Sequence, residues 1–273
     1  MVDFRRYLPN KRSPEKSGSG NLPELKSRDV VPTGNTDMRT FEERREKFRQ
    51  QGQAQEVRQR QQRSTAPVHF AFAIDGTGSM EPFITDTKGS IGEIIRRVQE
   101  LAQQTVAIQF FIYRDYHDRR AGILEVSELS SNYQYLSGWL HRITAWGGHD
   151  MPEAIEYTLH RILSQGGFRA VLLAGDAPSH TAREIREQSW ERMPTAQELA
   201  RSFGERELPI HTFIVQQDPA TVQDFRAIAA AAGGVTGYLQ RNRNDMLDMA
   251  VMAILECLAG RSAVESYIPE RIC

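Results

Sequence analysis

Three short segments of the chain combine carboxylate and hydroxyl side chains with glycine or proline. They are residues 75–79 (Asp-Gly-Thr-Gly-Ser), residues 147–153 and residues 176–180. In each segment an aspartate lies in a Gly-containing or Pro-flanked turn, where the backbone can bend sharply and approach an ion closely. The candidate ligands of a metal ion are therefore Asp75, Thr77, Ser79, Asp150 and Asp176.

The types of these ligands favour magnesium. Carboxylate and hydroxyl oxygens are hard ligands, and Mg²⁺ binds such oxygens in near-octahedral geometry at about 2.0–2.1 Å while it keeps some waters. Mn²⁺ is the alternative ion, whereas Zn²⁺ is disfavoured because the set needs neither Cys nor His. Three directly bound aspartates would give the ion and its ligands a net negative charge. Asp150 therefore coordinates either directly or through a water, and the sequence leaves both open.

The same residues also have structural interpretations. Aspartate and threonine in strand-to-helix turns commonly cap the helix that follows, and Ser79 lies near the start of an expected helix. His149 and His180 are near the candidate ligands in sequence, and hydrogen bonding within the loops is favoured over metal ligation for both. Arg114 and Asp115 form either a pair that steadies the site from behind or an ion pair at the surface.

Hydrophobic periodicity predicts the elements that position these segments. Short apolar runs that stop at polar turns are typical of buried parallel strands, and apolar residues at helical spacing mark the segments between them. Strands are expected at 68–74, 105–113, 123–129, 170–174, 210–215 and 235–239. Helices are expected at 82–104, with an apolar stripe that ends at Leu101, and at 133–143, 152–163, in a polar region up to 207, at 220–232 and at 244–258.

This alternation of strands and helices indicates an α/β fold, in which a doubly wound, Rossmann-like, mostly parallel sheet has helices on both faces. The third strand follows a tight turn at 119–122 and is expected to be antiparallel at one edge. Ligands of such sheets bind at the carboxyl ends of the strands, where the loops converge. Residues 75–79 and 176–180 follow two strands directly, and residues 147–153 follow the helix at 133–143.

The three segments together resemble the von Willebrand factor A (vWA) domain family. Asp75-x-Thr77-x-Ser79 is similar to the family signature D-x-[ST]-x-S at the end of a first hydrophobic strand. The family usually has a Thr of a Gly-Gly-x-Thr loop at the fourth metal-site position and an Asp after the fourth strand at the fifth. Asp150 and Asp176 are at the matching positions. The resemblance covers about residues 67–259 and implies a metal-ion-dependent adhesion site (MIDAS) on the upper face of the sheet.

One subgroup of the family is a closer match. The segments 113–116 (Tyr-Arg-Asp-Tyr), 147–153 and 176–180 resemble the vWA domains that are linked to alpha-kinases and many bacterial stand-alone relatives. Asp150 departs from the usual family pattern because a charged carboxylate replaces a neutral hydroxyl. If Asp150 coordinates directly, the metal would attract a partner's carboxylate less strongly than in the usual site.

Charge and composition suggest where the domain begins and ends. The whole chain has a net charge of −1, but residues 1–65 contain 15 Lys and Arg against 9 Asp and Glu. This basic arm is predicted to be disordered over 1–37. Over 40–63 a solvated or partly formed helix is expected, with a docking helix as the alternative. The vWA domain is expected at 66–260, followed by a C-terminal tail at 261–273.

Several classes of protein are disfavoured by the sequence. The two cysteines are too few for a disulfide framework. The start of the chain lacks the pattern of a signal peptide, and the longest apolar stretch near the end is too short to span a bilayer. A cytoplasmic protein without membrane contact is therefore expected. The charge of the arm is diffuse and its aromatic residues are few, which disfavours nucleic acid as a partner.

Two functions remain for the metal site. In the first, the domain is not an enzyme but a protein-interaction module, whose Mg²⁺ binds an Asp or Glu of a partner in an intracellular assembly or signalling system. The candidate partners are a kinase, a phosphatase or an AAA-type ATPase. In the alternative, a metal-dependent hydrolase or phosphatase uses the same carboxylates, with His149 or His180 as the base that activates water. No phosphate-binding loop, dinucleotide fingerprint or G-x-S-x-G elbow supports an enzyme.

Overall fold

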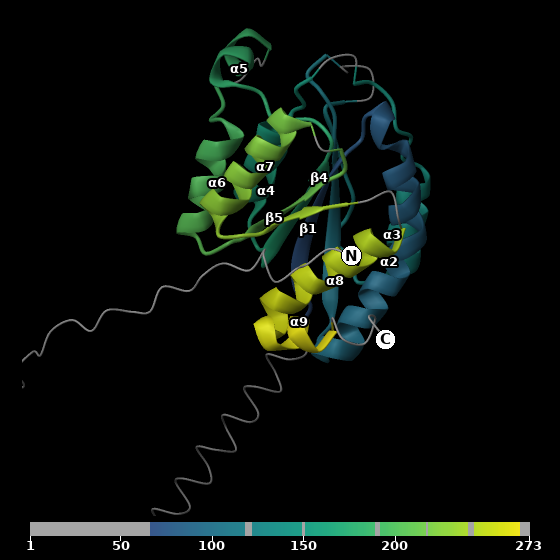
Figure 1. The fold of residues 1–273 in the computed structure, drawn as a ribbon. Helices are drawn as coiled ribbons and strands as arrows, with labels where there is room; N and C mark the ends of the chain where they lie inside the picture. The colour runs from purple at the N-terminus through teal and green to yellow at the C-terminus, as the bar shows by residue number, and fades with distance from the viewer. Residues whose placement is uncertain are drawn as a thin grey trace, which may run out of the picture. The chain divides into compact units, whose positions relative to one another are not determined.

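The computed structural model describes residues 66–117, 122–148, 151–188, 192–216, 218–239 and 243–267. In these ranges the chain forms a six-stranded sheet with the strand order β3-β2-β1-β4-β5-β6. Neighbouring strands are parallel, except that β3 is antiparallel to β2. The predicted fold class is therefore confirmed: a mostly parallel, Rossmann-like sheet with an antiparallel edge strand and helices on both faces (Figure 1).

The strands are short apolar runs that end in polar turns. They are β1 (Val68–Asp75), β2 (Val106–Tyr113), β3 (Leu124–Val126), β4 (Ala170–Gly175), β5 (Ile210–Ile214) and β6 (Thr236–Tyr238). In the parallel pairing, Asp75 is opposite Tyr113 of β2, and Ile74 is opposite Ala174 of β4. The carboxyl ends of β1, β2 and β4 are thus adjacent, and the loops that follow them meet at one edge of the sheet.

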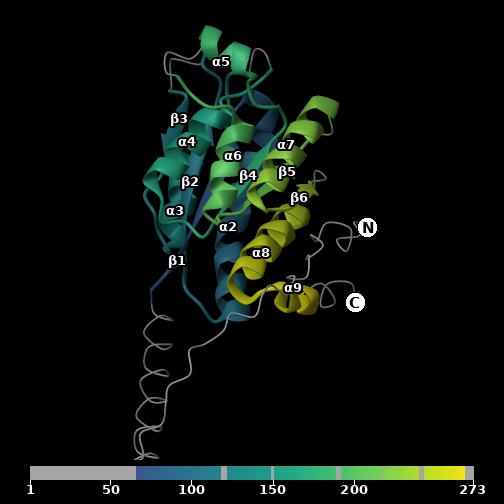
Figure 2. The same cartoon turned by 90° about the vertical axis from the view of Figure 1, so that its left-hand side faces the viewer.

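Most of the described helices lie in two layers. The described helices are η2 (Gly78–Met80), α2 (Glu81–Ala102), α3 (Tyr133–His141), α4 (Ile155–Gln165), α5 (Ala182–Gln188), α6 (Ala196–Glu205), α7 (Pro219–Ala232), α8 (Arg243–Ala259) and α9 (Arg261–Tyr267). Helices α2, α3 and α8 cover one face of the sheet, and α4, α6 and α7 cover the other (Figure 1, Figure 2).

Local signals fix where several helices begin. Asn132 caps α3 by accepting hydrogen bonds from two backbone N–H groups. Thr195 and Glu198 form a reciprocal capping box at α6. Asp218 caps α7, whose first residue is Pro219. These caps satisfy backbone donors that the first turn of a helix leaves without partners.

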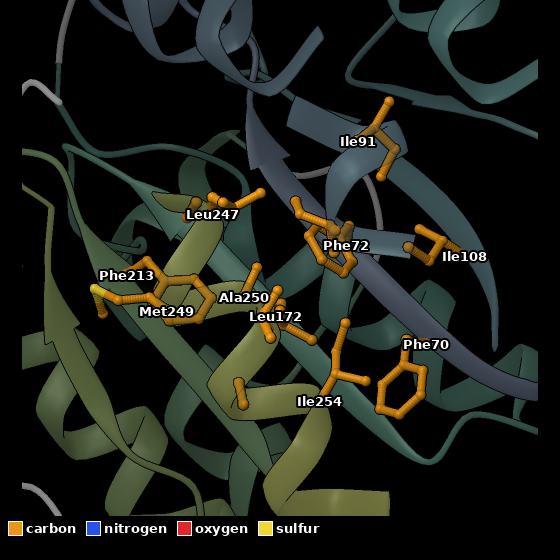
Figure 3. Packing of buried hydrophobic residues seen from close by; sticks show 14 of the residues in the cluster. Phe70, Phe72, Ile91, Ile108, Leu172, Phe213, Leu247, Met249, Ala250 and Ile254 are labelled. Atoms are coloured by element: carbon orange, nitrogen blue, oxygen red, sulfur yellow. The ribbon is translucent and has the colours of Figure 1, made fainter. Parts of the chain in front are cut away.

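Both faces of the sheet are buried, which follows from the alternation of side chains along a strand. In β1, Phe70, Phe72 and Ile74 belong to the core below α2 and α8, whereas Ala71 and Ala73 belong to the core below α4, α6 and α7. Figure 3 shows the first core, in which side chains of α8 face those of β1, β4 and β5. The strands can therefore be apolar almost throughout, as parallel strands usually are.

The structure differs from the sequence-based expectation in three respects. The third strand is shorter than predicted. Leu101, at the end of the predicted apolar stripe of α2, is 43% exposed, because the last turn of α2 extends beyond Val98, its last buried residue. Helix α9, which the sequence did not predict, places Val264 and Tyr267 in the core. In the part of the chain that the structure describes, no helix is both long enough and apolar enough to cross a membrane.

Candidate metal centre

Asp75, Thr77 and Ser79 form one hydrogen-bonded group at the end of β1. Asp75 is the last residue of the strand and is fully buried. Its Oδ1 accepts hydrogen bonds from the backbone N–H of Thr77 at 2.8 Å and from the Thr77 hydroxyl at 2.6 Å. The exposed Ser79 has its hydroxyl oxygen 3.4 Å from that of Thr77. Thr77 is the N-cap residue of η2 but makes no side-chain capping bond, so its hydroxyl serves Asp75 rather than the helix.

Asp176 lies at the end of the neighbouring strand β4 and is 8% exposed. Gln216, which follows β5, donates a hydrogen bond from Nε2 to Asp176 Oδ2 at 2.9 Å. The Thr221 hydroxyl donates to the Asp176 carbonyl at 3.2 Å. A methyl group added to Gly175 would come within 3.5 Å of the Asp75 Cβ. The β5–α7 segment thus supports Asp176 at the edge of the sheet where Asp75 also lies.

The loop before Asp150 packs against the first segment. The backbone N–H of Trp146 donates to the Gly76 carbonyl at 3.1 Å, and the N–H of Gly78 donates to the Gly147 carbonyl at 3.4 Å. Gly148 has a φ of +75°, and a Cβ there would be 2.9 Å from the Thr77 Cβ. His149 and Asp150 lie outside the described residues, so their positions relative to the metal stay predictions.

The environment of Asp75 fits a cation. Burial raises the pKa of Asp75 to about 7; hydrogen bonds from Thr77 lower it, and the nearby charge of Asp176 raises it. Oδ2 of Asp75 is buried and accepts no hydrogen bond from the described part of the chain. A buried carboxylate oxygen without a donor is costly, and a hard divalent cation would remove that cost.

The donor set depends on hydroxyl groups as well as carboxylates. Among the residues that the structure describes, no group of three or more His, Cys, Asp or Glu side chains is arranged to hold a metal ion. The described members of the predicted set are two carboxylates, Asp75 and Asp176, and two hydroxyls, Thr77 and Ser79. This all-oxygen set suits Mg²⁺ or Mn²⁺.

Arg114, at the end of β2, connects β3 with the loop before Asp150. Its side chain is fully buried. One guanidinium nitrogen pairs with the Glu125 carboxylate at 2.8 Å, and another donates to the Thr144 carbonyl at 3.1 Å. The guanidinium carbon lies 5.4 Å from the centre of the Trp146 ring. Because Arg114 and Asp115 are both buried, an ion pair at the surface is excluded.

Asp115 faces His180 from the β4–α5 loop. The distance from Asp115 Oδ1 to His180 Nε2 is 3.0 Å, and His180 Nδ1 lies 3.1 Å from Glu156 Oε1 of α4. The His180 side chain is fully buried. Both ring nitrogens therefore face carboxylates, and His180 is not available as a base for a metal-bound water. The loop-bonding role expected for His180 agrees with this geometry.

Two supporting residues, Glu156 and Gln216, were not found from the sequence. Glu156 lies in the first turn of α4, where an acidic side chain usually lies at the surface and interacts favourably with the helix dipole. Its full burial depends on packing that the local sequence does not reveal. Gln216 follows the end of β5 by two residues. The strand-end rule that pointed to Asp75 and Asp176 could have pointed to Gln216 as well.

Comparison with known proteins agrees with this fold. Residues 69–192 match the family model described as von Willebrand factor A domain. The open conformation of the pilus adhesin SpaC from Lactobacillus rhamnosus GG superposes with a TM-score of 0.50 and 13% identity, covering 71% of this chain and 30% of that chain. This chain therefore carries a domain of the von Willebrand factor A family. Its place in the alpha-kinase-linked subgroup stays a prediction.

Two further similar proteins are larger than the matched region. The putative ariadne-like RING finger protein R811 of Acanthamoeba polyphaga mimivirus is 24% identical over 205 residues, which are 71% of this chain and 20% of that protein. Proximal thread matrix protein 1 from the mussel byssus, with a zinc-occupied MIDAS motif, has a TM-score of 0.49 and 13% identity, covering 71% of this chain and 46% of that chain. This chain thus spans less than half the length of these proteins.

Proposed function

We propose that this vWA domain is a metal-dependent protein-interaction module. Mg²⁺, or Mn²⁺ as the alternative, is held by Asp75, Thr77, Ser79, Asp150 and Asp176 at the carboxyl end of the sheet. The observation that carries the proposal is the state of Asp75. One oxygen is fixed by two hydrogen bonds from Thr77, while the other is buried and accepts none from the described residues.

An open coordination position would connect the metal to a partner. Mg²⁺ prefers six ligands and retains waters when a protein supplies fewer. Ser79 is exposed, in contrast to Asp75 and Thr77, so the ion would face solvent on the side of Ser79. An Asp or Glu of another protein would replace a water there. Candidate partners are a kinase, a phosphatase or an AAA-type ATPase in an intracellular system.

The geometry of His180 speaks against the hydrolase alternative. A general base must reach the proton that it removes, directly or through one water. Both nitrogens of His180 are held by Asp115 and Glu156 in the interior. The alternative then depends on His149 as its base.

The first test measures metal binding through stability. A metal that binds only the folded state stabilises it by about 2.7 kcal/mol at a hundredfold excess over Kd. We expect added Mg²⁺ to raise the melting temperature of the wild type relative to EDTA, and Asp75→Ala to abolish the increase. Thr195→Ala is the control. It removes the cap of α6 and costs about 1 kcal/mol, yet should keep the full response to Mg²⁺. Equal melting temperatures of the wild type in saturating Mg²⁺ and in EDTA would refute the metal site.

The second test measures partner binding. Proteins captured by the full chain in Mg²⁺ should be released by EDTA and should not be captured by Asp75→Ala. Capture by Thr195→Ala should match the wild type. Partners that remain bound in EDTA would show that the interface does not use the metal.

A further inference from the structure

A second group of charged side chains lies in the interior next to the predicted metal site. Asp115, Glu156 and His180 are each at most 2% exposed. They come from three separate elements: Asp115 follows β2, Glu156 lies on α4, and His180 belongs to the β4–α5 loop. None of the three is a predicted ligand, and the proposed metal binding does not use them directly.

The contacts of His180 define its protonation state. Nε2 lies 3.0 Å from Asp115 Oδ1, and Nδ1 lies 3.1 Å from Glu156 Oε1. Each ring nitrogen is thus within ion-pair distance of a carboxylate oxygen, and the negative charges of two ionised carboxylates favour the protonated, positively charged ring. A buried imidazolium ion between two carboxylates offsets part of the cost of burying the three groups, and removing one partner would leave a buried charge uncompensated.

Further hydrogen bonds hold the two carboxylates in place. The Tyr116 hydroxyl donates to Glu156 Oε1 at 2.7 Å, and the Tyr116 backbone N–H donates to Asp115 Oδ1 at 2.6 Å. The exposed His117 lies with Nδ1 2.8 Å from Asp115 Oδ2. Carboxylates that are fixed in this way give His180 one preferred position.

The pKa values agree with an ionised group. Burial lowers the pKa of His180, but the hydrogen bonds and charges of Asp115 and Glu156 outweigh burial and raise it to about 9. Burial opposes ionisation of Asp115, but hydrogen bonds from His180, His117 and Tyr116 hold its pKa below the usual value.

The position of the group connects it to two predicted ligands. His180 lies four residues after Asp176, in the same loop. Glu156 lies in the first turn of α4, which follows the loop that contains Asp150. The backbone N–H of Glu153 donates to the Pro178 carbonyl at 2.9 Å, which ties the same two segments together.

We infer that His180 is a positioning residue, a buried imidazolium ion that clamps the β4–α5 loop to β2 and α4 and so holds Asp176 in metal-binding geometry. The effect on metal affinity rests on the proposed function, whereas the contacts of His180 with Asp115 and Glu156 are present in the folded chain without a metal. Loss of a residue that orients metal ligands from behind typically costs 10–100-fold in affinity.

The test compares two buried histidines in the full-length chain. His211 of β5 is 3% exposed, and its Nε2 lies 3.5 Å from the Cys257 sulfur. It lies near the amino end of β5, away from the metal loops. We expect His180→Gln to raise the Kd for Mg²⁺ about tenfold or more in calorimetric titration. The matched control His211→Gln should leave the Kd for Mg²⁺ at the wild-type value, because His211 orients none of the predicted ligands.

Two measurements test the clamp independently of metal binding. Nitrogen-15 NMR of the wild type at neutral pH should show both ring nitrogens of His180 protonated. Amide hydrogen exchange should be faster over residues 177–181 in His180→Gln than in the wild type. If His180→Gln does not fold, Glu156→Gln takes its place, since it removes one of the two charges and keeps a similar shape.

The outcomes separate the two ideas. A wild type that binds no Mg²⁺ refutes the proposed function, and the clamp is then decided by the NMR and exchange results. A neutral His180, or unchanged exchange in the folded variant, overturns the clamp. Unchanged Mg²⁺ affinity in folded His180→Gln, with normal binding by the wild type, overturns the positioning role while the proposed function stands.

Discussion

Among single residues, Gly148 has no room for a side chain next to Thr77. Its φ of +75° is in the left-handed region, which costs other residues roughly 1–2 kcal/mol. A Cβ there would also lie 2.9 Å from the Thr77 Cβ. We expect Gly148→Ala to lower the free energy of unfolding by about 2 kcal/mol and, because Thr77 is displaced, to weaken the stabilisation by Mg²⁺. Urea denaturation with Mg²⁺ and with EDTA measures both effects.

Gly233 provides a matched control for that substitution. It has a φ of +72° at the end of α7, and a Cβ there would meet nothing within 4 Å. Gly233→Ala should therefore lose only the unfolding free energy that the left-handed backbone conformation costs an alanine, and it should keep the full stabilisation by Mg²⁺. Equal stabilisation of the two variants by Mg²⁺ would show that a side chain at position 148 next to Thr77 does not affect metal binding.

The sequence indicates candidate ligands more readily than it indicates the residues that support them. Asp75 and Asp176 could be predicted because their side-chain type and their place after an apolar run are both visible in the sequence. Glu156 could not be predicted in this way, because the local sequence of a glutamate in the first turn of a helix does not show whether its side chain is exposed or buried. Glu156 contacts His180 because α4 packs next to the ends of β2 and β4 in the folded domain. Asp150, predicted from its Gly-containing loop after the expected helix at 133–143, lies outside the described residues.

Among the elements, α9 is connected to the rest of the domain in part by Tyr267. Tyr267 is 5% exposed and is part of the core. Its hydroxyl donates to Asp248 Oδ1 of α8 at 2.6 Å and accepts from Arg97 of α2 at 3.2 Å. Tyr267 thus attaches α9 to α2 and α8 by both packing and hydrogen bonds.

Two substitutions at Tyr267 separate these contributions. Tyr267→Phe keeps the ring and should cost about 1 kcal/mol for the lost hydrogen bonds. Tyr267→Ala also removes the buried ring and should cost about 3 kcal/mol. Both values are measured as the difference in unfolding free energy in urea. If the two variants were equally stable, packing of the ring would contribute nothing.

The difference between α9 and the strands shows what periodicity can and cannot predict. The strands β1, β2 and β4 are nearly continuous apolar runs that are buried on both faces, so their type follows from their own residues. Helix α9 has seven residues, and its buried side chains are Val264 and Tyr267. Two apolar positions do not define a period, and this helix is stabilised by α2 and α8 rather than by its own sequence.

In the molecule as a whole, two buried histidines have opposite electrostatic environments. His180 faces the carboxylates of Asp115 and Glu156, and the charge of Glu184 of α5 also acts on it. Its pKa is therefore raised to about 9. His211 is buried in β5, and burial lowers its pKa to about 4. Folding thus favours the charged form of His180 and the neutral form of His211.

These opposite shifts predict the dependence of stability on pH. The contribution of His180 is fully present below its unfolded pKa of 6.5 and is lost as the pH rises through 9. The contribution of His211 is present above pH 6.5 and is lost as the pH falls towards 4. Each amounts to at most about 3 kcal/mol. Relative to the wild type in EDTA, His180→Gln should show a smaller decline in unfolding free energy between pH 6.5 and 9, and His211→Gln a smaller decline between pH 6.5 and 4. An alkaline decline in His180→Gln that parallels the wild type would show that His180 is not an imidazolium ion in the folded protein.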